Sequence, residues 1–96
     1  LETALNIETL TNLRVINERL DRGVNHVYLS GPGAVMNVSL KELSTNYTIY
    51  VRPGNVIIEH YLGTNTNSIN AYEVEETELH NGTYTIKNEM GVIVIE

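Results

Sequence analysis

The spacing of apolar residues changes at Gly23, and this change constrains the fold more than any other feature. Before Gly23, apolar side chains recur at the three-to-four-residue spacing of one helix face. After it, short runs rich in Val, Ile, Tyr and Thr alternate with Gly, Asn and Pro, as in strands joined by turns. The sequence therefore predicts an α+β fold. We expect one N-terminal amphipathic helix, then six or seven short, mainly antiparallel strands arranged as a small sandwich, roll or partly open barrel.

The length of 96 residues predicts one domain over 1–96, with the helix at 6–22 and a β unit at 24–96. A narrow apolar stripe marks the expected helix, and its members are Leu10, Leu13, Ile16 and Leu20. Glu18 and Arg22 form an i,i+4 pair in the favourable order, and Gly23 suits the position just after the helix. We expect the stripe to face either the sheet of the same chain or another protein surface.

The first strands are expected at 24–29, 34–40, 47–52 and 56–62. Pro53-Gly54 separates the last two. Because Pro-Gly favours a type II turn, which matches a two-residue hairpin poorly, we expect a four-residue loop at Arg52–Asn55. The core face of this hairpin would carry Tyr47, Ile49 and Val51 against Val56 and Ile58.

The second half of the β unit begins with a polar segment, 63–68, which we expect to be a loop. Asn81-Gly82 predicts a type I′ hairpin turn that places Leu79 opposite Tyr84. A further turn is expected at Asn88–Gly91. The final run, Val92–Ile95, is apolar without alternation, which indicates a strand buried on both faces.

Composition narrows the possible functions. The formal net charge is −6, with four basic and five acidic residues up to position 48 and two basic and seven acidic residues after it. An acidic chain repels phosphate backbones, so we expect no direct binding to nucleic acid. The absence of cysteine excludes disulfides and thiolate chemistry. No apolar run approaches the roughly 20 residues of a membrane span, so we expect no membrane partner.

Catalytic and metal-binding patterns are weak. His26, His60 and His80 share no ligand-like spacing, and neither Ser30 nor Ser39 lies in a nucleophile-elbow sequence. We therefore expect no enzymatic activity, no metal and no cofactor. Sequons occur at Asn37, Asn46 and Asn81, a number that chance explains in an Asn-rich chain.

Two groups of residues are candidates for contacts with a partner. The candidate binding residues are Tyr50, Arg52, Glu73, Glu75, Glu76 and Glu78. The candidate oligomer interface comprises the helix stripe (Leu10, Leu13, Ile16, Leu20) and two residues of the last strand, Val92 and Val94. Tyr is enriched at interfaces, and an apolar terminal strand is unusual at an exposed sheet edge.

These features predict a non-catalytic protein-binding or assembly module, and we expect a homo-oligomer. Two alternatives stay open. The glutamates could form an acidic ridge that inhibits a nucleic-acid-binding enzyme, or simply guard a solvated edge strand. Alternatively, Tyr50, Arg52 and segment 63–68 could bind a small ligand between protomers. The Asn/Thr/Ile/Tyr-rich composition is typical of bacteriophage or low-GC bacterial accessory proteins, which favours a cytoplasmic or virion-associated location.

Overall fold

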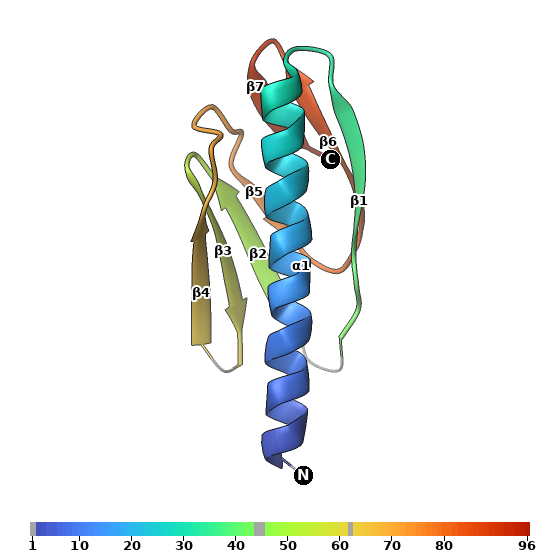
Figure 1. The fold of residues 1–96 in the computed structure, drawn as a ribbon, viewed down its shortest axis with the longest axis vertical. Helices are drawn as coiled ribbons and strands as arrows, with labels where there is room; N and C mark the ends of the chain where they lie inside the picture. The colour runs from blue at the N-terminus through green and yellow to red at the C-terminus, as the bar shows by residue number, and fades with distance from the viewer. Residues whose placement is uncertain (1, 44–45, 62) are drawn as a thin grey trace.

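The computed structural model describes the backbone of residues 2–43, 46–61 and 63–96, and the side chains of the helix from Leu10 onward. The elements in chain order are α1 (Glu2–Ser30), β1 (Val35–Leu40), β2 (Tyr47–Arg52), β3 (Asn55–His60), β4 (Gly63–Ser68), β5 (Thr77–Leu79), β6 (Gly82–Glu89) and β7 (Val92–Ile95). The predicted α+β class is confirmed: among the described residues, one helix precedes seven strands, which pair antiparallel in two open sheets (Figure 1).

The helix is longer than predicted, and the strand expected at Val24–Leu29 is wrong. Those residues form the last turns of α1. Val24 and Val27 continue the apolar stripe at helical spacing and are completely buried. Burial against the sheets therefore outweighs the strand preference of Val and Tyr.

Gly23 lies inside the helix and not at its end, so its predicted role as a cap is wrong. A Cβ atom at this position would lie 3.0 Å from Ile86 Cδ1 and 3.5 Å from Met36 Sδ. Its missing side chain lets α1 approach β1 and β6 closely. This close approach offsets the roughly 1 kcal/mol that glycine costs inside a helix.

The C-terminal end of α1 is held by Asn88 of β6, a residue that is only 3% exposed. Its Nδ2 donates to the carbonyl oxygens of Val27 and Tyr28 at 3.2 and 3.4 Å, and its Oδ1 accepts the Gly91 N–H at 2.8 Å. Helix carbonyls near the C-terminus lack partners within the helix. A side chain 60 residues away therefore supplies the cap that the sequence assigned to Gly23.

The two sheets have the strand orders β1-β6-β7 and β4-β3-β2-β5. In the four-stranded sheet, Ile49 pairs with Ile58 and Val51 pairs with Val56, and all four are completely buried, as predicted. Arg52 pairs with Asn55, so the connection is the two-residue turn Pro53-Gly54. The expected four-residue loop is wrong, and Gly54 meets the type II requirement with a φ of 79°.

Segment 63–68, expected to be a loop, is the edge strand β4, which pairs along its full length with β3. Strong pairing partners can recruit a polar segment that has low strand propensity of its own.

Asn81-Gly82 does not form the predicted hairpin. Leu79 pairs with Ile49 in the four-stranded sheet, whereas Tyr84 pairs with Val38 in the other. The chain crosses between the sheets here, because the buried Leu79 side chain belongs to the core beneath β2. Gly82 still has a φ of 139°, which favours glycine.

The turn predicted near Asn88–Gly91 is present, between β6 and β7. Glu89 pairs with Val92, which leaves Met90 and Gly91 as a two-residue turn. Their φ values are 56° and 93°, the positive values that a type I′ turn needs. Alternate residues of β7 are buried (Ile93, Ile95) and half-buried (Val92, Val94), so the prediction of burial on both faces is wrong.

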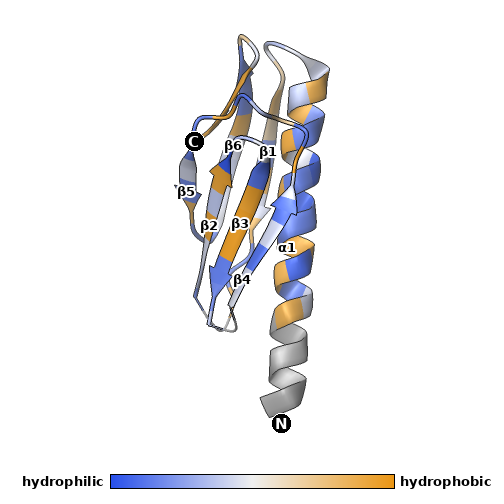
Figure 2. Ribbon diagram, turned by 90° about the vertical axis from the view of Figure 1, so that its left-hand side faces the viewer, coloured by the Kyte–Doolittle hydropathy of each residue, from blue (hydrophilic) through white to orange (hydrophobic). Residues whose placement is uncertain are grey.

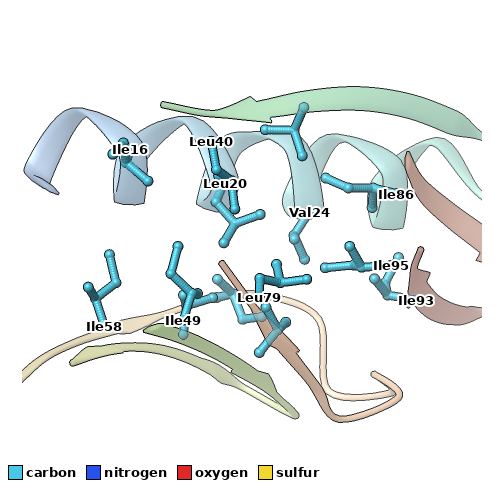
Figure 3. Packing of buried hydrophobic residues seen from close by; sticks show 14 of the residues in the cluster. Ile16, Leu20, Val24, Leu40, Ile49, Ile58, Leu79, Ile86, Ile93 and Ile95 are labelled. Atoms are coloured by element: carbon cyan, nitrogen blue, oxygen red, sulfur yellow. The ribbon is translucent and has the colours of Figure 1, made fainter. Parts of the chain in front are cut away.

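One hydrophobic cluster joins α1 to both sheets. Figure 3 shows Ile16, Leu20 and Val24 of the helix pointing toward Ile49, Ile58 and Leu79 of one sheet, with Ile86, Ile93 and Ile95 of the other sheet at one end. The helix lies in front of the two sheets in Figure 1, and its buried side chains pack against both (Figure 3).

Candidate protein-binding surfaces

The predicted helix stripe divides into a buried part and an exposed start. Leu13, Ile16 and Leu20 are buried within the chain, at 4% exposure or less, so they pack on its own sheets and offer no surface to a partner. Leu10 is 43% exposed. The 29 residues of α1 span about 43 Å at the usual helical rise, and the first turns extend past the strands (Figure 1).

A polar groove of about 350 Å³ lies beside this exposed start, between α1 and β4. Its helix wall is formed by Leu10, Leu13, Arg14 and Asn17, and its strand wall by residues 65–67. Asn17 is 4% exposed, and its Oδ1 has no hydrogen-bond partner among the described residues. A buried acceptor without a donor costs roughly 1–3 kcal/mol.

The next turn of the helix also meets β4. The Nδ2 of Asn67 donates to Asp21 Oδ2 at 3.1 Å, and the Asn70 N–H donates to Asn25 Oδ1 at 2.9 Å. Burial raises the pKa of Asp21 to about 6, against a smaller lowering by the Asn67 hydrogen bond. Its Oδ1 has no described partner. Polar groups with incomplete hydrogen bonding therefore lie along the side of α1 that faces β4.

The candidate binding residues separate into two surfaces. Tyr50 pairs with Glu78 across β2 and β5, and the Arg52 guanidinium lies 5.8 Å from the Tyr50 ring centroid. Glu59 Oε2 accepts the Tyr50 hydroxyl at 3.4 Å. Desolvation, followed by the charges of Glu59 and Glu78, raises the pKa of Tyr50. These side chains share the outer face of the four-stranded sheet, which Figure 2 views from the front.

Alternate residues of segment 63–68 lie on the same outer face. Tyr50 pairs with Ile57, which in turn pairs with Thr66 of β4. The structure therefore brings together three elements that the sequence proposed for a ligand site, but on an open sheet surface.

The remaining glutamates lie elsewhere, so the residues proposed for one acidic ridge are divided between the two sheets. The Ile93 N–H donates to the Glu73 carbonyl at 2.8 Å, and the Glu75 N–H donates to the Ile93 carbonyl at 2.9 Å. Residues 73–75 thus run along β7, while Glu78 belongs to β5 in the other sheet. Buried Val74 and Leu79 draw the two parts of the segment toward different sheets.

A second groove, of about 500 Å³, lies between α1 and β1 and was not anticipated from the sequence. We call it the α1–β1 groove. Its helix wall is Arg19, Arg22, Gly23 and His26, and its strand wall is residues 36–39. The three basic side chains have the i, i+3, i+7 spacing of one helix face, which is visible in the sequence. Because the helix was expected to end at residue 22, His26 was assigned to a strand and the groove was not predicted.

Within the part of the chain that the structure describes, no three His, Cys, Asp or Glu side chains gather to hold a metal ion. The described part of α1 is not apolar enough over a bilayer-spanning length to cross a membrane. No protein-family model matches this chain, and neither characterised proteins nor solved structures give a match to it.

Proposed function

We propose that this chain is a non-catalytic assembly module that binds further copies of itself through the N-terminal end of α1. The observation that carries the proposal is the extension of this helix past both sheets (Figure 1). Short helices are marginal in water without tertiary packing. The projecting turns therefore gain stability when another helix or groove packs against them.

The residues at the base of the projection support a protein partner. Leu10 is exposed on the same helix as the buried Leu13, so the apolar stripe continues beyond the chain's own core. The adjacent groove beside β4 is lined by the polar residues Arg14 and Asn17 of the helix and by residues 65–67 of the strand. A helix from a second copy can cover Leu10 while its polar side chains contact the polar walls of this groove.

Sedimentation equilibrium at micromolar concentration tests this function. Self-assembly predicts a mass above the 10.8 kDa of one chain and a melting temperature that rises with protein concentration. A clean monomer with a melting temperature independent of concentration would refute the proposal.

The second candidate function is inhibition of a nucleic-acid-binding enzyme, and it predicts a different result in the same experiment. The exposed Glu73, Glu75 and Glu76 favour it, because surface charge of one sign accelerates encounter with a basic partner. It predicts a monomer that forms a salt-sensitive 1:1 complex with a basic nucleic-acid-binding protein.

A further inference from the structure

The three-stranded sheet has two unlike ends. At one end, the edge of β1 has no further strand among the described residues, since β1 pairs only with β6. At the other end, β7 is covered by residues 73–75, which pair with Ile93. Alternate residues of an extended segment direct their backbone groups to opposite sides, so Val74 turns its N–H and C=O away from β7.

The β1 end is an open edge beside a basic groove. Residues 36–39 point alternately to the two faces of the sheet, yet all of them line the α1–β1 groove. The groove therefore runs along the strand edge. Arg19, Arg22 and His26 border it from α1, together with Gly23.

The β1 strand itself carries no charged residue. Its residues Val35 and Met36 are 61% and 40% exposed. Proteins commonly guard open edges with charges, prolines or bulges, because an open edge accepts another strand. An extended segment that adds to β1 would supply the missing backbone hydrogen bonds.

The opposite end of the same sheet has the complementary charge. Glu73, Glu75 and Glu76 are all exposed along or just after the segment that covers β7. We propose, building on the assembly function above, that the α1–β1 groove of one copy binds the Glu73–Glu76 segment of the next copy. The segment adds to the β1 edge, and its carboxylates face Arg19 and Arg22.

Charge favours this head-to-tail contact over pairing of two β1 edges. A symmetric β1–β1 contact would bring Arg19 and Arg22 of both copies to one interface, where like charges repel. The head-to-tail contact pairs opposite charges and continues the three-stranded sheet from copy to copy. Because the two surfaces differ, the contact is heterologous and produces rings or open filaments.

Charge reversal of the two surfaces tests the proposal. The double variants Arg19→Glu/Arg22→Glu and Glu73→Lys/Glu75→Lys should each associate at least about tenfold more weakly than wild type. An equimolar mixture should recover association, because each groove then meets a segment of opposite charge. The control is Glu89→Lys, which reverses an exposed charge at the end of β6, outside both surfaces, and should change nothing.

Wild-type association that survives both reversals would overturn this contact and leave the assembly function standing. Failure of the mixture to recover association would also overturn the contact. A monomeric wild type refutes the assembly function and this contact together.

Cysteine cross-linking gives a second test, because the chain contains no cysteine. Ser39→Cys lies in the groove wall and Glu76→Cys lies in the acidic segment. Oxidation should give covalent dimers only when the two variants are mixed. Efficient dimers of Ser39→Cys alone would show paired β1 edges and would refute the head-to-tail arrangement.

Discussion

The two ends of α1 are built from the same kind of stripe but have different surroundings. Leu13 is 1% exposed beneath the sheets, whereas Leu10, one turn earlier, is 43% exposed. From Leu13 to Val27 the helix completes the core of its own chain. Toward its N-terminus the same helix extends past the ends of the strands (Figure 1). Helical periodicity identifies an apolar face, but only the tertiary structure shows whether that face is covered.

The largest difference between the two parts of the helix is expected when each leucine is replaced by a charged residue. Leu13→Asp puts an unpaired carboxylate into the core and should cost about 3–5 kcal/mol or more, enough to unfold a domain of this size. Leu10→Asp should leave the monomer folded, because its side chain reaches solvent. Far-UV circular dichroism during urea titration measures both. Equal midpoints for the two variants would contradict the division of the stripe.

The C-terminal end of the helix depends on Asn88. Asn88→Ala removes the donor to the Val27 and Tyr28 carbonyls and the acceptor of the Gly91 N–H. Because buried groups lose their partners, the free energy of unfolding should fall by about 1–3 kcal/mol. Glu89→Ala, an exposed neighbour, is the matched control for urea denaturation. If the two variants are equally stable, Asn88 does not anchor the helix.

The smallest change in stability is expected for a substitution of Asp21, in the middle of the helix. Its pKa is raised from 3.8 to about 6, so the folded state binds the proton more tightly than the unfolded state. This stabilisation is fully present below pH 3.8 and is lost as the pH rises through about 6. Asp21→Asn removes the charged form and should stabilise the protein at neutral pH by about 1 kcal/mol, a value reduced for partial exposure.

Thermal melting of Asp21→Asn at acidic and neutral pH checks this expectation. The difference from wild type should nearly vanish below the unfolded-state pKa. A variant that is less stable than wild type at neutral pH would show that the Asn67 contact requires the carboxylate.

The sequence was sufficient for the elements whose patterns are local. The stripe through Leu13 and Leu20 and the pairing of Ile49 with Ile58 follow from periodicity alone. The predictions were wrong where residues distant in the sequence determine the local structure. Asn88 extends the helix past Gly23, and strand pairing assigns Leu79 and Tyr84 to different sheets.

The candidate binding surfaces likewise depend partly on local sequence patterns and partly on contacts between distant residues. Composition identifies the glutamates at 73–78, but the burial of Val74 beside Ile93 places only the first part along β7. The basic border of the α1–β1 groove depends on the helix continuing to His26. Propensity could not predict this continuation, because it is stabilised by contacts with β6.

The most direct test of the assembly account is the mass of Leu10→Asp beside that of wild type, by sedimentation equilibrium at equal micromolar concentrations. Assembly through the projecting end of α1 predicts a wild-type mass above 10.8 kDa and a folded Leu10→Asp variant whose mass is lower than that of wild type. The conservative control Leu10→Met should keep the wild-type mass. A monomeric wild type, or a Leu10→Asp variant that retains the full wild-type mass, would contradict the account.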